Sequence, residues 1–462
     1  MSSGERVQVA VVGAGIAGLS LAYRLMQRGV EVRVLEGASR AGGNIQSELH
    51  QGYRCEWGPN GFLDNEPATL RLVDDLGLRE QLAPASPLAN TRWIVRGGKL
   101  RALPTKPQAF LTSDVLSVAG RARVLLEWAQ PAMKTGDDES VWDFAHRRIG
   151  REAADVLVDA MVTGVYAGDP RRLSLEAAFP RMRAMERDYG SLLGAMRAMK
   201  RAGKAGGGPM GPGGTLTSFR DGMETMVLAL VQALGTRVAL GHRLVSLRQQ
   251  SGGWHLEFER GASLECDRVV LASPAWHASG LVQPLDADLS RELDAIPSAP
   301  VVVVCVGWKA ADVAGVTPGF GFLLPSRERF GILGTLFDSC VFPARAPQGQ
   351  ALWRTLLGGA RDRGAIDLDD GTILDRVLRA YQKLLGLRAT PDMIYIVRHA
   401  RGIPQYPVGH VQRVHRIEEH TARLPGLTLS GNSYHGIAMN ACIKESEALA
   451  AGWDAARNVP AR

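Results

Sequence analysis

Residues 7–36 run VQVAVVGAGIAGLSLAYRLMQRGVEVRVLE, and this segment sets the architecture of the chain. Its first six residues are an apolar run with little alternation, which is typical of a parallel strand covered on both faces. Residues 19–27 have the periodicity of a helix that ends near Gly29, and residues 31–35 form a second apolar strand. The order strand, glycine turn, helix, strand within about 30 residues predicts a βαβ unit and an α/β fold.

A glycine fingerprint joins the first strand to the helix. The pattern G-x-G-x-x-G is formed by Gly13, Ala14, Gly15, Ile16, Ala17 and Gly18. The first glycine makes the tight turn, the second lets the backbone approach a pyrophosphate, and the third lets the helix pack close to the strand. Glu36 ends the second strand, where its carboxylate can accept a hydrogen bond from a ribose hydroxyl. These features predict a dinucleotide site; the alternative is a glycine turn in a generic α/β unit.

The residues after Glu36 favour FAD over NAD. Residues 37–44 run GASRAGGN and give the pattern E-x-x-x-R-x-G-G. Arg40 can neutralise a diphosphate, and Gly42 and Gly43 let the backbone come close to the cofactor. This run resembles the FAD-binding signature of the amine oxidase and protoporphyrinogen oxidase superfamily, so we expect FAD as the cofactor.

The composition is that of an ordinary globular protein. The chain has 462 residues, of which 45% are hydrophobic and 22% charged. This length predicts two to four domains and a large core. No apolar run approaches the ~18–20 residues of a bilayer span, and a strand begins at Val7 where a secretory signal would lie. We therefore expect a cytoplasmic protein.

The charge and the cysteines exclude other classes of protein. The net charge is +7, but the basic residues are scattered and no nucleic-acid motif is present, so nucleic acid is not an expected partner. The five cysteines have no C-x-x-C spacing and indicate reduced thiols. The histidines show no ligand pair, and we expect no metal.

After residue 110, the sequence pattern changes from helical periodicity to a glycine-rich loop and then to strands. Residues 111–200 are helical, with Ser113 or Asp114 as the cap of a helix through Leu126, followed by helices over 140–147 and 152–161. Residues 203–214 hold seven glycines in GKAGGGPMGPGG and predict a flexible loop. The pattern then predicts strands, at residues 237–240, 244–247, 254–258, 264–271, 300–308, 319–324, 332–336 and 352–357. A strand at 427–430 precedes a helix from about Asn440.

Five sequence blocks narrow the family. They are EWGPNGFL (56–63), TGVYAGDP (163–170), GFGFLLP (319–325), GIPQY (402–406) with Gly409-His410, and GNSYHGIAMNACI (431–443). They keep the order found in protoporphyrinogen oxidases, and the chain resembles that family over nearly its whole length. Asn60 departs from the arginine of some members, and this leaves open which porphyrinogen is preferred.

The resemblance assigns residues to the two ligands. The expected FAD contacts are Gly13, Ala14, Gly15, Ile16, Ala17, Gly18, Glu36, Gly37, Arg40, Gly42, Gly43, Asn44, Gly58, Pro59, Asn60, Gly61, Val245, Gly431, Ile437, Ala438 and Met439. The expected tetrapyrrole contacts are Arg92, which would pair with a propionate, Gly168, whose carbonyl would face the pyrrole N–H groups, and Phe320, Leu323 and Leu356 as apolar walls. No residue is identified as a catalytic acid or base.

The implied activity is oxidation of protoporphyrinogen IX to protoporphyrin IX in haem biosynthesis. Six hydrogens leave in three flavin cycles, each by hydride transfer from a meso carbon to flavin N5, with O2 as acceptor and H2O2 as product. One alternative is oxidation of coproporphyrinogen III to coproporphyrin III. Another is a flavin-bearing porphyrin-binding protein without turnover. The resemblance also allows two protein partners: a second copy of the chain in a homodimer, and a ferrochelatase that receives the product.

The resemblance also predicts an interrupted Rossmann-like FAD domain of the glutathione-reductase and amine-oxidase type. We assign residues 1–86, 213–295 and 400–462 to it. A mixed-sheet substrate domain takes 87–110 and 296–399, the helical insertion takes 111–202, and the glycine-rich loop is 203–212. The insertion resembles the family's membrane-associating segment, and the chain is expected at the inner face of the cytoplasmic membrane. The basic residues expected to meet anionic lipid are Arg121, Arg123, Arg147, Arg148 and Arg151.

Overall fold

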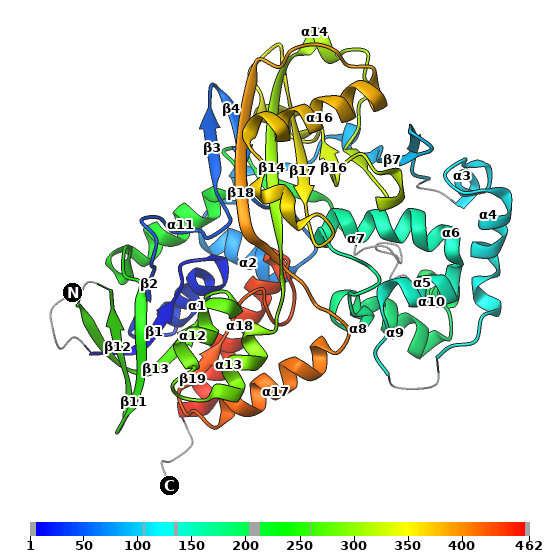
Figure 1. The fold of residues 1–462 in the computed structure, drawn as a ribbon. Coiled ribbons are helices and arrows are strands. Elements are labelled where there is room, and N and C mark those ends of the chain that lie inside the picture. The colour runs from blue at the N-terminus through cyan, green and yellow to red at the C-terminus, as the bar shows by residue number, and fades with distance from the viewer. Residues whose placement is uncertain (1–5, 105–106, 134–136, 203–212, 260, 458–462) are drawn as a thin grey trace.

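The computed structural model describes residues 6–104, 107–133, 137–202, 213–259 and 261–457. It is a mixed α/β structure in three lobes (Figure 1): a first sheet beside the N-terminus, a second sheet above it, and a helical lobe to one side. The glycine-rich loop predicted for residues 203–212 lies outside the described residues. The domain limits given above stay predictions.

The first sheet is built around the N-terminal strand. Its strands are β10 (Val238–Ala239), β2 (Val32–Leu35), β1 (Arg6–Val12), β13 (Ser263–Leu271), β12 (Gly253–Phe258) and β11 (Leu244–Gln250), in that order, with β19 (Leu427–Leu429) on β13. β1 is parallel to β2 and to β13, while β11 and β12 extend the sheet as an antiparallel hairpin. The predicted βαβ unit is confirmed, and its strands match within one residue, but α1 begins at Ile16, three residues before the predicted start at Leu19.

Helices cover both faces of this sheet. One face carries α1 (Ile16–Gln27), α2 (Pro67–Asp75), α11 (Glu224–Leu234) and α18 (Met439–Arg457); the other carries α12 (Ala275–Val282), α13 (Ala287–Asp294) and α17 (His410–Ala422). Val9 and Val11 are buried against the first group of helices, whereas Ala10 and Val12 are buried against the second. The unbroken apolar run of β1 exists because both of its faces are covered.

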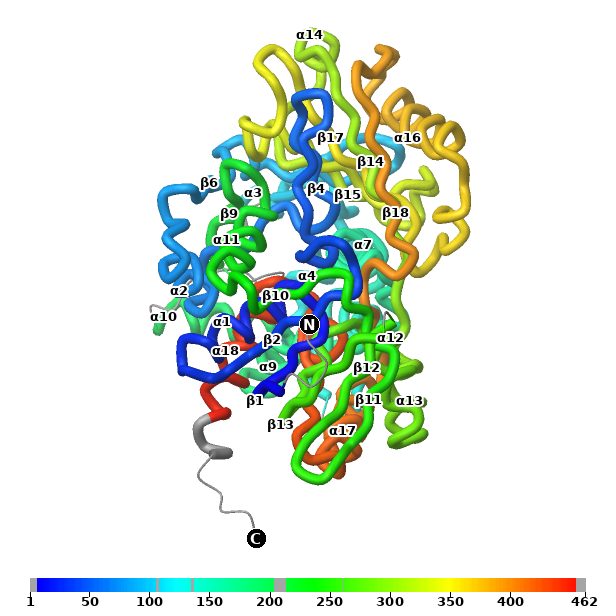
Figure 2. Tube along the Cα trace, turned by 90° about the vertical axis from the view of Figure 1, so that its left-hand side faces the viewer, coloured from blue at the N-terminus to red at the C-terminus, as the bar shows by residue number. Residues whose placement is uncertain are grey.

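The second sheet is mostly antiparallel. In order, its strands are β18 (Met393–Pro404), β14 (Ser298–Lys309), β17 (Gln350–Gly358), β16 (Gly334–Leu336), β15 (Gly321–Leu323), β7 (Trp93–Arg96) and β8 (Lys99–Ala102). One face packs on α16 (Asp370–Leu385) and the other on the hairpin of β3 (Ser47–His50) and β4 (Tyr53–Glu56). Figure 2 shows the long strands β14 and β18 running side by side down toward the first sheet. Strand β18 had not been predicted.

Small elements fill the junction between the lobes. The short helix α14 (Ala310–Val313) lies apart from the junction, at the far tip of the upper lobe (Figure 1). At the junction, strands β5 (Phe62–Leu63), β9 (Leu216–Phe219) and β6 (Leu82–Pro84) form a three-stranded sheet, and α15 (Asp338–Val341) is a short helix. These elements place the segment after β4 next to the second sheet, which positions part of the site described below.

The helical lobe corrects one expected helix start. Its helices are α3 (Pro107–Thr112), α4 (Val118–Leu125), α5 (Val141–Ile149), α6 (Arg151–Ala153), α7 (Asp159–Tyr166), α8 (Leu175–Ala178), α9 (Pro180–Tyr189) and α10 (Leu192–Arg201). The cap predicted at Ser113 or Asp114 is wrong, because the side chain of Ser117 accepts from the Gly120 N–H and starts α4. Asp114 instead forms an ion pair with Arg101.

The prediction that five arginines of this lobe meet anionic lipid is wrong for two of them, Arg147 and Arg148. Arg148 is fully buried and pairs with Glu127 and Glu186, and Arg147 pairs with Glu186 and Glu139, so these two arginines bind carboxylates inside the lobe. Within the described ranges, no helix is both long and apolar enough to cross a membrane.

Candidate functional site

The glycine loop has the geometry that its sequence predicts. Gly13 has φ +109°, and a Cβ there would lie 2.8 Å from the Ala272 carbonyl oxygen. A Cβ at Gly18 would lie 2.0 Å from the Gly13 carbonyl oxygen, so only glycine lets α1 start this close to β1. Two of the three glycines are therefore required by the protein's own packing.

The remaining glycine of the fingerprint, Gly15, faces open space. A Cβ at Gly15 would have no protein atom within 4 Å, and at Gly431 it would meet only the Ala272 carbonyl oxygen, at 4.0 Å. Gly43, with φ +59°, lies against Gly15. These three backbones line a cradle at the N-terminus of α1, and no side chain caps that helix start. Free N–H groups at a helix N-terminus fit a diphosphate, so the residues present fit FAD.

Glu36 and Arg40 organise the same loop. The Glu36 carboxylate accepts from the Ala14 N–H and the Ala38 N–H, each at 2.8 Å. Arg40 donates to the carbonyl oxygens of Ala41 and Gly43, and its guanidinium lies 4.9 Å from the Trp57 ring centre. The structure thus brings Glu36, Arg40 and the glycine loop together; whether they bind the cofactor stays a prediction.

The segment 58–61 packs on this loop from the side of the second sheet. A Cβ at Gly58 would lie 2.3 Å from the Asn44 carbonyl oxygen, so the two predicted contacts are adjacent. The Asn44 side chain donates to the Gly402 carbonyl oxygen at 3.2 Å. Asn60 is buried and donates to the Asp338 carboxylate at 3.0 Å. Asn60 thus has a partner in the second lobe.

The remaining predicted cofactor residues come from two other segments. Val245 is half exposed and sits at a bulge of β11, where the pairing with β12 skips it. Ile437 and Ala438 directly precede Met439, the first residue of α18, and the Ala438 carbonyl accepts from the Ala441 N–H. Close to this turn, burial raises the pKa of Glu445 to about 7, while the Gly431 N–H opposes the shift.

Arg92 and Phe320, two of the predicted substrate contacts, lie next to each other. The Arg92 guanidinium is 5.1 Å from the Phe320 ring centre, and the Phe320 N–H donates to the Thr91 carbonyl oxygen at 2.8 Å. Arg92 is exposed and Phe320 is half-buried. The pair offers one cation beside one flat apolar surface.

Leu323 and Leu356 occupy one row of the second sheet. Leu323 pairs with Gly334, and Gly334 pairs with Leu356, so a glycine separates the two leucines. The Leu323 side chain covers this glycine, because a Cβ at Gly334 would lie 3.2 Å from Leu323 Cδ2. Sequence reasoning missed Gly334, although it falls inside the predicted strand 332–336.

Gly168 lines a cavity of about 190 Å³ with Leu324, Leu333 and Phe330 among its walls. Its backbone follows Ala167, which has φ +47° and whose carbonyl oxygen accepts from the Ala360 N–H. A Cβ at Gly168 would lie 2.7 Å from Gln405 Oε1, so this position excludes larger residues.

Sequence reasoning also missed a buried cluster of charges behind residues 56–60. Arg345 pairs with Glu56 at 2.7 Å, and Arg354 donates to the Gly58 carbonyl oxygen at 2.7 Å and lies 3.5 Å from Asp338. Burial raises the pKa of Glu56 and of Asp338, and the arginines oppose both shifts. No local pattern marks these residues, because they meet only through the tertiary fold. Among the described residues, no group of three or more metal-ligating side chains is present.

Comparison with known proteins identifies the family. Residues 16–459 match the model of the flavin-containing amine oxidoreductases. The chain is 34% identical to human protoporphyrinogen oxidase over 476 residues, covering 96% of this chain and 97% of the relative. It belongs to the flavin-containing amine oxidoreductases, in their porphyrinogen oxidase branch. The family resemblance and the FAD cofactor predicted from sequence are thereby confirmed, and the chain is an oxidoreductase.

Relatives in this family carry two different names. Coproporphyrinogen III oxidase of Bacillus subtilis is 30% identical over 470 residues, which are 97% of this chain and 98% of the relative. The chloroplastic protoporphyrinogen oxidase of Oryza sativa subsp. japonica is 32% identical over 460 residues, 94% of this chain and 85% of the relative. Overall similarity therefore does not choose between the two substrates.

Two solved structures share the fold. A protein of Exiguobacterium sp. 255-15, provisionally named a protoporphyrinogen oxidase, superposes with a TM-score of 0.84 at 22% identity, covering 99% of this chain and 100% of that one. Reduced UDP-galactopyranose mutase gives a TM-score of 0.75 at 15% identity, covering 98% and 96%. The arrangement of mixed sheets and helices is thus that of these flavoproteins.

Proposed function

We propose that this oxidoreductase converts protoporphyrinogen IX to protoporphyrin IX in haem biosynthesis, with O2 as the final acceptor. The observation that carries the proposal is the contact of Arg92 with Phe320, at the start of the β15 segment whose Leu323 shares a row of the second sheet with Leu356. A tetrapyrrole needs flat apolar walls and a cation for each propionate that it anchors, and this wall supplies both. The family names of the relatives support the same substrate class.

The residues of the chain divide the work as follows. FAD, when bound, supplies the acceptor for the hydride that leaves the substrate. The cradle of Gly15, Gly43 and Gly431 would hold its diphosphate, and Glu36 its ribose. Arg92 would fix the position of the macrocycle through one propionate, and the apolar wall excludes water from the opposite face. The pyrrole nitrogens shed the balancing protons, so no side chain is assigned as a base.

The experiment compares two substrates. Purified protein in air receives protoporphyrinogen IX or coproporphyrinogen III, and porphyrin fluorescence and H2O2 are followed together. Faster turnover of protoporphyrinogen IX supports the proposal. Bound FAD with no turnover of either substrate would indicate a porphyrin-binding protein and overturn it.

Coproporphyrinogen III is the second candidate substrate. The Bacillus subtilis relative of that name matches the chain over nearly the full length of both proteins. Faster turnover of coproporphyrinogen III in the same assay would move the function to this candidate while leaving the fold and cofactor unchanged.

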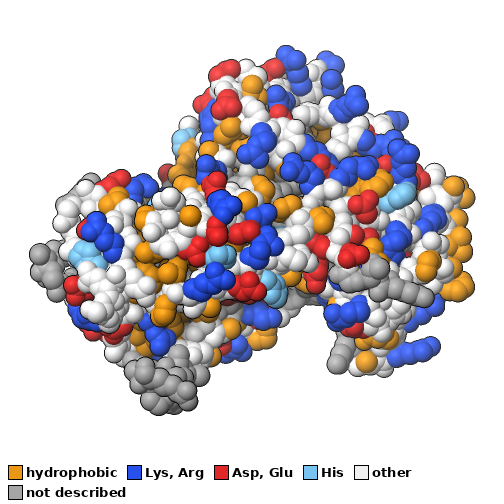
Figure 3. Space-filling model, turned by 60° about the horizontal axis from the view of Figure 1, so that its bottom comes forward, with side chains coloured by type: hydrophobic (Ala, Val, Ile, Leu, Met, Phe, Trp, Pro, Cys, Tyr) orange, Lys and Arg blue, Asp and Glu red, His pale blue; other side chains and the backbone are white. Residues whose placement is uncertain are grey.

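We also propose peripheral attachment to the inner face of the cytoplasmic membrane. Segment 107–129 of the helical lobe carries five large exposed apolar side chains, Leu111, Val118, Leu125, Leu126 and Trp128. Figure 3 shows hydrophobic side chains gathered along this outer edge. Exposed aromatic and aliphatic groups on short helices suit the bilayer interface. Flotation with anionic liposomes tests this: Trp128→Ser should reduce the bound fraction, and absence of lipid binding by the unmodified protein would overturn it.

A further inference from the structure

A second cavity, of about 660 Å³, lies where the helical lobe meets the second sheet. Its lining includes five arginines, Arg96, Arg151, Arg171, Arg327 and Arg361. Three carboxylates, those of Glu152, Asp155 and Asp159, complete the charges, so five positive and three negative groups leave a formal excess of +2. None of these eight residues is among the predicted contacts of the flavin or the tetrapyrrole.

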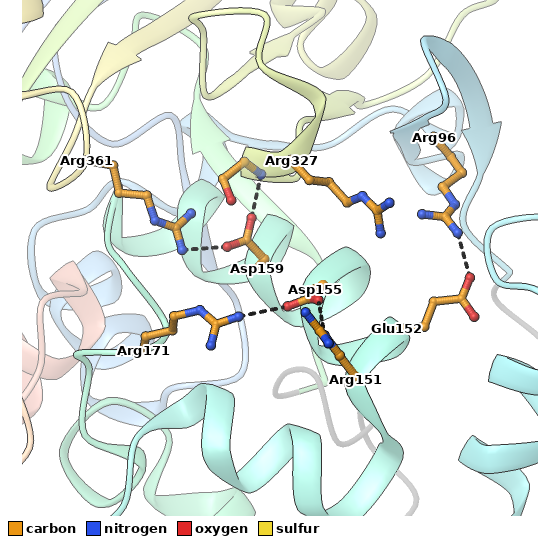
Figure 4. Close-up of a pocket in the computed structure, with 9 residues that line it drawn as sticks. Arg96, Arg151, Glu152, Asp155, Asp159, Arg171, Arg327 and Arg361 are labelled. Atoms are coloured by element: carbon orange, nitrogen blue, oxygen red, sulfur yellow. Dashed lines mark hydrogen bonds and ion pairs between the residues drawn. The ribbon is translucent and has the colours of Figure 1, made fainter.

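Four of the arginines are held in place by carboxylates, each through one nitrogen in the ion pair (Figure 4). Arg96 pairs with Glu152 at 2.6 Å, and Arg361 with Asp159 at 2.6 Å. Asp155 lies 3.2 Å from Arg171 and 3.6 Å from Arg151. Since a guanidinium carries five N–H donors, these pairs orient the arginines without using up their capacity to bind an anion.

Two further contacts fix the walls. The Arg171 guanidinium lies 3.6 Å from the centre of the Trp142 ring, which holds it flat. Arg361 also pairs with Asp169 at 2.9 Å, so it bridges two carboxylates. The donors of Arg96, Arg171 and Arg361 are therefore preorganised, and a ligand would spend little free energy on ordering these three side chains.

Arg327 differs from the other four. It is exposed on a short turn over Ser326–Glu328, and it forms no hydrogen bond or ion pair with any residue in the described part of the chain. Figure 4 shows it between Arg361 on one side and Arg96 on the other. Its charge helps to lower the pKa of Glu152, while its five N–H donors stay available to a ligand on this side of the cavity.

We propose that this arginine cavity binds an anion that carries two or more carboxylates. Guanidinium groups match carboxylates through paired hydrogen bonds, and several fixed arginines around one cavity favour a ligand with several carboxylates. Its volume lies in the range of small-molecule sites. Two sources have this chemistry: the propionate edge of a tetrapyrrole, or a free polycarboxylate.

The structure connects the arginine cavity to the proposed substrate wall. Ser326 and Arg361 line both this cavity and the smaller one that contains Gly168. A tetrapyrrole passing Gly168 could therefore place carboxylates among the arginines. This source rests on the proposed function, whereas the polycarboxylate site does not.

The test is calorimetric titration of the holoenzyme at low ionic strength, with coproporphyrin III in one arm and citrate in the other. Arg327→Ala should raise the Kd by about tenfold, the usual effect of losing one charge-assisted contact. Arg327→Lys, which keeps the charge but not the fork, should lie between the two. Arg248→Ala is the control, because Arg248 is an exposed arginine of the first sheet with a single carboxylate partner, Glu257; it should bind as the unmodified protein does.

The two arms separate the sources. An effect of Arg327→Ala on coproporphyrin III alone identifies the tetrapyrrole, and an effect on citrate identifies a free polycarboxylate; both support the site. The proposal is overturned if Arg327→Ala binds both ligands as the unmodified protein does, or if neither ligand binds. Porphyrinogen turnover is measured on the same preparations, so a failure of the proposed function appears separately as absent turnover.

Discussion

Individual glycines of the nucleotide loop have different physical reasons to be glycine. Gly18 is required by packing, because its Cβ would overlap the Gly13 carbonyl oxygen, while Gly15 faces an open cradle. Gly18→Ala should lower the free energy of unfolding by roughly 1–3 kcal/mol. Gly15→Ala should leave the apoprotein as stable as before but weaken FAD binding by about tenfold, since its methyl group fills the cradle.

Urea unfolding of the apoproteins and titration with FAD measure the two effects separately. A Gly15→Ala apoprotein that is as destabilised as Gly18→Ala, or that binds FAD normally, would show that the cradle is not the diphosphate site.

Arg92 gives the second prediction at this scale. If its guanidinium pairs with a propionate, Arg92→Ala removes a charge-assisted contact and should raise KM by about tenfold with little change in kcat. Arg92→Lys should recover only part of the loss, because an ammonium cannot form the two parallel hydrogen bonds. Steady-state kinetics with the preferred porphyrinogen measure both variants; an unchanged KM for Arg92→Ala would remove the anchor.

Sequence patterns located residues well where their reason is local. The fingerprint glycines and Glu36 were predicted from one continuous segment, and the structure joins them within it. Arg148 was misjudged because its burial depends on Glu127 and Glu186, which lie in other parts of the lobe. The arginine cavity was missed for the same reason, since its walls come from five separated segments.

At the scale of single elements, helix α17 begins with a histidine whose protonation is unfavourable in the folded protein. Its first residue, His410, is buried, stacks on Tyr406 with ring centres 4.1 Å apart, and lies 3.1 Å from the Tyr434 carbonyl oxygen. Burial lowers the pKa of His410 from 6.5 to about 4. The unfolded chain therefore binds more protons than the folded one between these values, and stability falls as the pH drops through this window.

The loss attributable to His410 should reach about 3 kcal/mol by pH 4. About 2 kcal/mol of this loss should appear between pH 7 and pH 5. Urea unfolding at the two pH values measures it, and His410→Gln should flatten the dependence between them. His415→Gln, at an exposed position of the same helix, is the matched control and should leave the dependence unchanged. A His410→Gln protein with the pH dependence of the original would contradict this assignment.

Strands differ in how far the sequence alone determines them. β1 and β14 are continuous apolar runs and were predicted within a few residues. β18 mixes charged and apolar residues over Met393–Pro404 and shows no clean period, so only its pairing with β14 makes it a strand. The start of α4 was misplaced because three nearby residues, Ser113, Asp114 and Ser117, are all good caps, and only Ser117 starts the helix in the fold.

At the scale of the whole molecule, the buried charged residues behind residues 56–60 connect this segment to the upper lobe. Glu56 ends β4 and Gly58 follows it, whereas Arg345 and Arg354 belong to the upper lobe. The side chains of Glu56, Arg345 and Arg354 are almost completely excluded from water. The Glu56 carboxylate also accepts from the Met223 N–H at 3.0 Å. Removing one member leaves an unpaired buried charge, which costs far more than removing both.

Arg345→Met should therefore lower the free energy of unfolding by about 3–5 kcal/mol, because it strands the Glu56 carboxylate in a dry interior. The double variant Glu56→Gln with Arg345→Met removes both charges and keeps an acceptor for the Met223 N–H, so it should regain most of that loss. Urea unfolding of the two single variants and the double variant gives the coupling directly. If the two single-variant losses of unfolding free energy simply add in the double variant, the pair does not hold the lobes together.

If the two losses couple, Arg345→Met should also loosen the adjacent segment 58–61. The fluorescence of released flavin should then rise in the Arg345→Met variant but not in the double variant.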